Sequence, residues 1–296
     1  MNIVILHTES GISYAKHIGR SLNWINEHKG TKFNPVLLSV NNVNKIKEYN
    51  KDNTIIHSRA ANPNADWMEK LVLLEEDGYK VVNNTETLKM TSNKLACTSF
   101  LSKMDLKQPE TLKYRKDSTV ESKTVLINYL LKTYGKFICK PVISQGQGIY
   151  VKVFSTEDTV EDIMKGIDNV PGNIVIIQEF INYDCLFRII VIGGKALPYV
   201  FYDKPTEDNW KVSVCLNKNI MFQSNPSPDL LYLAEQTQEA IKGEINFIDI
   251  FNTPDGFIVG EINTACNLRI HELKAKKAGH KEWNIHYRIA RYLTQI

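Results

Sequence analysis

Short apolar runs and amphipathic segments alternate through the first 88 residues of the chain. Strands are expected at residues 3–6, 35–40, 54–57 and 80–83, and helices at 13–28 and 66–76. Strands that alternate with helices in this way predict a parallel α/β arrangement. The pattern G-x-G-x-x-G does not occur there, so we do not expect a dinucleotide site.

The rest of the chain changes from a mixed pattern to one dominated by strands. Helix-start signals at Thr85 and at Thr91 or Ser92 precede a helical segment that Pro109 ends. Up to residue 180 the pattern indicates a small α+β unit, with helices at 120–134 and 159–167 and strands at 136–141, 149–154 and 173–180. Beyond it, strands are expected at 186–192, 195–202, 244–251 and 257–263, and helices at 229–242, 269–278 and 282–293.

The last two predicted strands carry polar residues where an apolar hairpin is expected. Glu261 and Asn263 are two positions apart, so they project from the same face of their strand. If residues 252–256 form the loop, Asp249 falls opposite Val259 and shares that face, diagonal to Glu261. A loop of four residues would place Asp249 on the other face. Two carboxylates and an amide oxygen on one apolar surface are costly unless a cation joins them, and such donors suit Mg²⁺. The alternative is a pair of charges at a solvent-exposed edge.

Composition adds few constraints. A hydrophobic content of 43% and a charged content of 23% are typical of a globular protein, and a net charge of +3 does not by itself indicate a nucleic-acid partner. The five cysteines include no C-x-x-C pair, which favours reduced thiols over disulfides or a zinc site. No apolar run approaches 18 residues, so a cytoplasmic protein without a membrane partner is expected.

Three other features could bind a nucleotide, although each also has a structural explanation. Lys140 ends an apolar strand just before the glycine-bearing segment 144–148, which suits a polyphosphate but equally a surface hairpin. The apolar strand that ends at Gln178 and Glu179 could present its backbone to an adenine edge, or simply leave the core. Arg188 could face a phosphate or a developing oxyanion, or form an ion pair with Asp184 or Asp203.

The order and spacing of these features resemble those of the ATP-grasp carboxylate–amine ligases, and among them the RimK-like glutamate ligases most closely. The resemblance spans nearly the whole chain. It rests on the following segments: Asn83 to Lys94, Phe137-Ile-Cys-Lys-Pro141, Gln145-Gly-Gln-Gly-Ile149, Gln178-Glu-Phe-Ile181, Arg188, Asp249 and Glu261-Ile-Asn263. It implies an α/β (α+β) ATP-grasp fold with a pre-grasp domain at 1–88, a central lid subdomain at 89–181 and a C-terminal subdomain at 182–296.

The resemblance also implies roles for single residues. Lys94 and Lys140 would hold the phosphates of ATP beneath a mobile loop that includes Ser144, Gln145, Gly146 and Gly148. Gln178, Glu179, Phe180 and Ile181 would form the hinge that reads adenine. Asp249, Glu261 and Asn263 would bind Mg²⁺ or Mn²⁺, and Arg188 would face the reacting phosphoryl or acyl group.

Several positions depart from the family pattern. Leu186 stands where the family usually has Asp, and Asp184 is the candidate for the ribose contact instead. Lys204, and Lys211 with Ser213, occupy the places of an Arg and of a Phe-Arg-x-Asn segment; lysine lacks the bidentate fork of arginine. After Asn263 the chain continues Thr264-Ala-Cys-Asn267 in place of a small residue and Ser-Pro-Gly. These departures predict a shift of substrate within the family.

The reaction that the resemblance implies joins a carboxylate to an amine. The acid would be converted by ATP into an acyl phosphate, and an amine would displace phosphate to form an amide or peptide bond. The partners would be amino-acid or peptide substrates, and the family often forms homo-oligomers. Three alternatives remain open: an ATP-grasp phosphotransferase, a peptide macrocyclase, and an ATP-binding regulatory protein without turnover.

Overall fold

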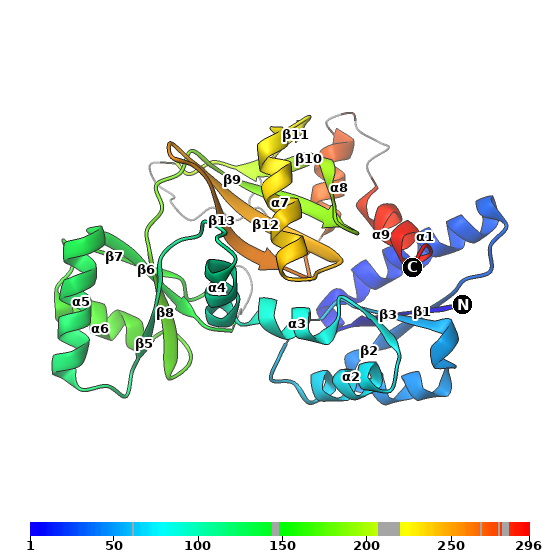
Figure 1. The fold of residues 1–296 in the computed structure, drawn as a ribbon, viewed down its shortest axis with the longest axis horizontal. Coiled ribbons are helices and arrows are strands. Elements are labelled where there is room, and N and C mark those ends of the chain that lie inside the picture. Colours follow the sequence, from blue (N-terminus) through cyan, green and yellow to red (C-terminus); the bar gives the residue numbers. More distant parts are fainter. Residues whose placement is uncertain (61, 144–147, 207–219, 267, 278, 280–283) are drawn as a thin grey trace.

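The computed structural model describes residues 1–60, 62–143, 148–206, 220–266, 268–277, 279 and 284–296. Its described strands form three β-sheets, of four, four and five strands. Figure 1 shows these sheets side by side along the molecule, with the N-terminal sheet at one end, the sheet of residues 111–179 at the other end and the five-stranded sheet between them. The predicted mixed α/β class is therefore confirmed.

The N-terminal sheet is parallel throughout, as the alternation of strands and helices predicted. Its order is β2-β1-β3-β4, formed by Asn34–Ser39, Asn2–His7, Thr54–Ser58 and Lys80–Val82. Helix α1 (Ile12–Lys29) covers one face, where Ile3 and Ile5 are buried, and α2 (Asp66–Glu76) covers the other, where Val4 and Leu6 are buried. Burial of both faces explains why β1 is a continuous apolar run.

Two short helices follow this sheet where the sequence contained two helix-start signals. Helix α3 (Thr85–Ser92) begins after Asn84, whose side chain accepts a hydrogen bond from the Thr87 amide. Helix α4 (Lys94–Lys103) begins after Asn93, whose side chain caps it through the Ala96 amide at 3.0 Å. The cap places Lys94 at the first position of α4, and the capping residue is Asn93 where the sequence suggested Thr91 or Ser92.

The sheet of residues 111–179 is antiparallel. Its order is β5-β8-β6-β7, formed by Thr111–Arg115, Ile174–Glu179, Lys136–Pro141 and Lys152–Ser155. Helices α5 (Val120–Tyr134) and α6 (Val160–Asp168) pack against it through a shared apolar core. The sequence pattern missed β5, and it placed the start of β7 at residue 149, where residues 148–150 form a turn instead.

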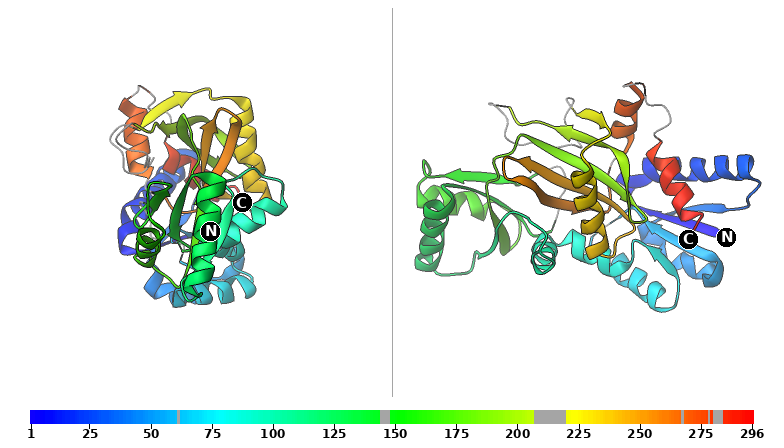
Figure 2. Two further views of the ribbon diagram at one scale, coloured as in Figure 1. Left: turned by 90° about the vertical axis from the view of Figure 1, so that its left-hand side faces the viewer. Right: turned by 45° about the horizontal axis from the view of Figure 1, so that its top comes forward.

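The C-terminal sheet is antiparallel and buries both faces. Its order is β11-β10-β9-β12-β13, formed by Met221–Ser224, Lys195–Asp203, Cys185–Ile192, Ile245–Thr253 and Gly256–Asn263. One face packs on α7 (Pro228–Ala240), and the other shares a core with α1 and with α8 (Leu268–Lys277) and α9 (Ile285–Leu293). Figure 2 shows α7 and α8 on different sides of these strands.

The hairpin of β12 and β13 has a register that differs from the expected one. Thr253 pairs with Gly256, so the loop has two residues, and Asp249 pairs with Glu261, not with Val259. A bulge at Gly260, between the Glu261 and Val259 pairs, restores the expected result that Asp249 and Glu261 share a face. The ring of Phe251 fills the space beside Gly260, since a Cβ there would lie 2.7 Å from it.

The side chain of Asn83 joins the N-terminal unit to the start of β12. It is fully buried, accepts from the amides of Glu244 and Ile245 at 2.6 and 2.8 Å, and donates to the Ile245 carbonyl at 2.8 Å. These bonds set the position of the N-terminal sheet relative to the strand that carries Asp249. Within the described residues, no helix is both long and apolar enough to cross a membrane.

Candidate active site

The three predicted metal ligands lie on one face of the C-terminal sheet. Asp249 and Glu261 are directly opposite each other on β12 and β13, and Asn263 is opposite Phe247, two positions along. Side chains at opposed positions of an antiparallel pair have Cβ atoms about 5 Å apart. The strands therefore bring two carboxylates and an amide together at the end of β13.

Arg188 extends this row of polar residues across the next strand. It pairs with Asp249 in the register of β9 and β12. Its Nε donates to Asp249 Oδ1 at 2.7 Å and its Nη2 donates to Oδ2 at 2.6 Å. Arg188 thus forms an ion pair with Asp249, an acid that the sequence had not suggested for this role.

This arginine–aspartate pair is buried, with side-chain exposures of 6% and 10%. Burial raises the pKa of the Asp249 carboxyl, and the charge and hydrogen bonds of Arg188 oppose that rise. A bidentate, charge-assisted pair is one of the few ways to keep such a carboxylate inside a protein.

Glu261 is surrounded by cations as well. Its carboxylate accepts a hydrogen bond from the ammonium group of Lys94, at the start of α4. The Lys94 amide donates to the Val142 carbonyl at 2.9 Å, which holds this helix start beside the segment that follows β6. Burial alone would raise the pKa of Glu261, but the charges of Lys94, Lys140 and Arg188 hold it at about 2.

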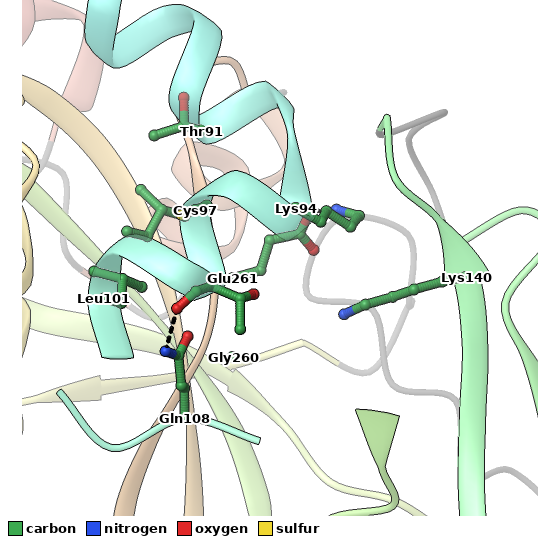
Figure 3. A pocket seen from close by; sticks show the side chains of 10 residues that line it. Thr91, Lys94, Cys97, Leu101, Gln108, Lys140, Gly260 and Glu261 are labelled. Atoms are coloured by element: carbon green, nitrogen blue, oxygen red, sulfur yellow. Dashed lines mark hydrogen bonds and ion pairs between the residues drawn. The ribbon is translucent and has the colours of Figure 1, made fainter. Parts of the chain in front are cut away.

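Lys140 reaches the same place from the other sheet. Figure 3 shows its side chain extending from β6 toward Lys94 and Glu261, across a pocket between α4 and β13. Burial, together with the neighbouring charge of Lys94, lowers the pKa of Lys140 to about 8. Two ammonium groups that share a single nearby carboxylate leave a positive charge for an anionic ligand such as a polyphosphate.

The sequence analysis missed several residues of this pocket, among them one thiol and one side-chain amide. Cys97 and Gln108 both line it. Burial raises the pKa of the Cys97 thiol to about 12. The side chain therefore stays a neutral thiol that lines the pocket, and it does not form the nucleophilic thiolate. Gln108 donates to the Thr98 carbonyl at 2.5 Å and holds the segment before β5 against α4. Neither belongs to a spacing pattern that could have identified it.

The predicted adenine hinge lies at the end of β8. Gln178 is buried and donates to the Thr111 hydroxyl at 2.5 Å. The amides of Glu179 and Phe180 donate to the carbonyls of Glu110 and Lys136, both at 3.2 Å, so neither of these amides is available to a purine. Phe180 lies under the Lys136 ammonium at 3.9 Å, and Ile181 is half-buried.

Three of the remaining predicted residues lie in the described part of the chain. Asp184 is exposed just before β9, where its amide donates to the Asn252 carbonyl at 2.9 Å. Lys204 is exposed just after β10. Gly148 has a φ of +61°, within a turn. The residues Ser144, Gln145, Gly146, Lys211 and Ser213 lie outside the described part of the chain.

The donor set fits a divalent ion of the Mg²⁺ type. Asp249, Glu261 and Asn263 supply hard oxygen atoms only, and Mg²⁺ is commonly held by one or two carboxylates together with substrate phosphates. The described residues contain no cluster of three or more His, Cys, Asp or Glu side chains arranged for a metal. A site with two protein carboxylates agrees with that finding, since the phosphates would complete it.

Comparisons with known proteins agree with this geometry. Residues 91–291 match the family described as the RimK-like ATP-grasp domain. The chain is 28% identical over 258 residues to a coenzyme γ-F420-2:α-L-glutamate ligase from Methanococcus maripaludis, covering 81% of this chain and 84% of that protein. It is also 28% identical over 199 residues to the α-aminoadipate–LysW ligase LysX from Saccharolobus solfataricus, covering 64% of this chain and 68% of that protein.

Solved structures share the fold along the whole chain. A RimK domain ATP-grasp protein from Sphaerobacter thermophilus superposes with a TM-score of 0.67 at 16% identity, covering 99% of both chains. D-alanine–D-alanine ligase from Bacillus anthracis, solved with ATP, superposes with a TM-score of 0.66 at 14% identity, covering 100% of this chain and 96% of that one. At such identities these structures support the fold alone.

Proposed function

Because the chain belongs to the RimK-like ATP-grasp family, whose relatives are ATP-dependent ligases that form C–N bonds, we propose that it joins an amino acid to a carboxylate through an acyl phosphate. The observation that carries the proposal is the opposition of Asp249 and Glu261 across one hairpin, with Lys94 and Lys140 facing them from two other elements. The arrangement combines oxygen donors for a divalent ion with cations for a polyphosphate.

The proposed reaction has two displacements. An oxygen of the substrate carboxylate attacks the γ-phosphorus of ATP, the bond to the bridging oxygen breaks, and ADP leaves. The amine then attacks the acyl carbon, loses a proton, and releases inorganic phosphate as the amide forms. A carboxylate oxygen is a poor leaving group, whereas phosphate is a good one, so the first step prepares the second.

The protein contributes mainly position and charge in this scheme. Lys94 and Lys140 hold the phosphates, and Asp249, Glu261 and Asn263 hold the divalent ion, which neutralises phosphate charge when bound. No nucleophilic side chain is needed, in agreement with the raised pKa of Cys97. Arg188 favours the ionised form of Asp249, and this pairing places its guanidinium beside the proposed metal ligands.

A product screen tests the proposal. The protein is incubated with ATP, Mg²⁺ and the twenty amino acids, alone and with short acidic peptides, and the products are identified by mass spectrometry. The proposal expects one amide formed for each ADP released. A phosphorylated substrate would instead identify a phosphotransferase, and an internal amide within a peptide would identify a macrocyclase. ATP binding without ADP release across the screen would contradict ligase activity.

A further inference from the structure

Arg59 lies where the N-terminal sheet faces the C-terminal sheet. It follows β3 directly, and its amide donates to the Leu6 carbonyl at 2.8 Å, so it extends the parallel pairing of β1 and β3 to their carboxyl ends. Helix α1 begins at the same edge: a Cβ on Gly11 would lie 3.4 Å from Arg59 Cγ. Figure 1 shows that α1 begins in the middle of the molecule and runs outward.

The Arg59 guanidinium rests on a fixed aromatic platform. Its Cζ lies 4.9 Å from the centroid of the Tyr14 ring. The Tyr14 hydroxyl and His57 Nε2 are 2.8 Å apart, and His57 Nδ1 is 3.1 Å from the Val82 carbonyl. A carbonyl only accepts, so His57 Nδ1–H donates to Val82 and Nε2 accepts from Tyr14. The ring under Arg59 is therefore held by a chain of buried hydrogen bonds.

One nitrogen of the guanidinium lacks an acceptor in the described part of the chain. Arg59 Nε is buried and has no hydrogen-bond partner among the described residues. Glu272, an acid whose charge acts on Tyr14, pairs with another residue: its Oε1 accepts from the His286 amide at 2.9 Å and lies 2.6 Å from His286 Nδ1. An unpaired donor of this kind is costly, and its planar fork matches a carboxylate.

Tyr14 connects this arginine to the C-terminal part of the chain, since its ring centroid lies 5.3 Å from that of His286 in α9. Tyr14 shares its apolar core with Phe247 of β12 and with Cys266. Cys266 is three residues beyond Asn263, a span of at most about 11 Å. The platform under Arg59 therefore belongs to the core that also underlies Asn263, which pairs with Phe247, while Arg59 itself does not line the pocket of Lys94, Lys140 and Glu261.

We propose that Arg59 binds the carboxylate of the amino acid that supplies the amine. This inference rests on the ligase function proposed above. An amino acid carries both an amine and a carboxylate, and it acts as the amine only if its carboxylate is kept away from the γ-phosphate. A cation on the N-terminal wall would hold that carboxylate while the amine reaches the acyl carbon.

Kinetics of three variants test the assignment. Arg59→Met removes the charge, and Arg59→Lys keeps the charge without the fork. Arg115→Met is the control, since Arg115 is exposed, pairs with Asp117 and lies on β5, in a different sheet from β3. For Arg59→Met we expect the KM of the amine substrate to rise about 10- to 100-fold, the range for a lost charged hydrogen bond. Arg59→Lys should recover part of the loss, and the KM of ATP should not change.

The carboxamide of the same amino acid separates recognition from a structural role. In wild type the change from carboxylate to carboxamide should raise KM about as much as Arg59→Met does, whereas the variant should not distinguish the two compounds. If the change to the carboxamide raises KM equally in wild type and in Arg59→Met, Arg59 does not contact the carboxylate and the inference is overturned. If Arg59→Met does not fold, the same comparison with Arg59→Lys decides.

A binding measurement tests the inference independently of turnover. Each of the twenty L-amino acids is presented to wild type and to Arg59→Met, with Mg²⁺ and a non-hydrolysable ATP analogue, and binding is followed by saturation-transfer NMR. At least one amino acid should bind wild type and not the variant; equal binding, or binding to neither, overturns the inference. Absence of ADP release in the product screen would instead contradict ligase activity, whatever this measurement shows.

Discussion

At the scale of single residues, the site consists of carboxylates that are already paired with cations. Asp249 is bound by Arg188 and Glu261 by Lys94. The two pairs differ in exposure: Asp249 is nearly buried, whereas 34% of the Glu261 side chain is exposed. They should therefore respond differently to removal of the carboxylate charge, although both are proposed to bind the same ion.

Asp249→Asn and Glu261→Gln should both lower turnover by more than about 100-fold, since loss of even a partner of a metal ligand costs about 10- to 100-fold. Their stabilities should diverge. Asp249→Asn removes the charge that faces the buried Arg188 guanidinium and should lose about 3 kcal/mol or more of unfolding free energy. Glu261→Gln should lose about 1 kcal/mol or less.

Urea denaturation and ADP release measured on the same preparations check this prediction. Glu261→Gln is the informative variant, since it is expected to stay folded. Turnover within a few-fold of wild type in that variant would contradict a metal-binding role for Glu261.

At the scale of elements, the hairpin of β12 and β13 depends on its bulge. Gly260→Ala would bring a Cβ to within 2.7 Å of the Phe251 ring. We expect a loss of about 1–3 kcal/mol in unfolding free energy, the range for overpacking. Adding Phe251→Leu should relieve the clash, so the double variant should be more stable than the sum of the two single changes predicts. Simple additivity in denaturant titrations would show that the ring does not set the bulge.

His57 is buried between Tyr14 of α1 and Val82 of β4, and its burial predicts that stability depends on pH. Burial lowers the pKa of His57 from 6.5 to about 4. Between these values the unfolded chain binds more protons than the folded one, so this contribution is complete above pH 6.5 and is lost as the pH falls toward 4. The loss should reach about 3 kcal/mol, at 1.36 kcal/mol for each pKa unit.

Denaturation at several pH values checks this dependence. His57→Gln, which cannot titrate, should show a shallower fall between pH 6.5 and 4 than wild type. His28→Gln is the matched control, because His28 is exposed and should leave the pH dependence unchanged. Identical slopes for His57→Gln and wild type would rule out His57 as the titrating group.

At the scale of the whole molecule, the sequence predicts most elements and less of their pairing. Apolar runs located the strands of the N-terminal sheet, of which β1 and β3 are buried on both faces. It missed β5, in which Lys113 and Arg115 are exposed and only Tyr114 is fully buried. It also missed the bulge at Gly260, which depends on contact with Phe251 and leaves no local signal.

The site residues likewise divide into those that the local sequence identified and those that depend on how the elements pack. Lys140, Asp249 and Glu261 were found because a charged residue in an apolar strand is conspicuous. The partner of Arg188 could not be predicted, since it depends on the order of strands β9 and β12 in the sheet. Cys97 and Gln108 were missed because they meet only through the packing of α4 against β13 and the segment before β5, and Arg59 because its position depends on the pairing of β1 with β3.

The three sheets together are proposed to activate a carboxylate as an acyl phosphate, and isotope transfer tests that claim most directly. The acid found by the product screen is prepared with ¹⁸O in its carboxylate and turned over with unlabelled ATP. The inorganic phosphate released should carry one ¹⁸O atom for each amide formed. Amide formation accompanied by unlabelled phosphate would contradict the acyl phosphate and, with it, the proposed mechanism.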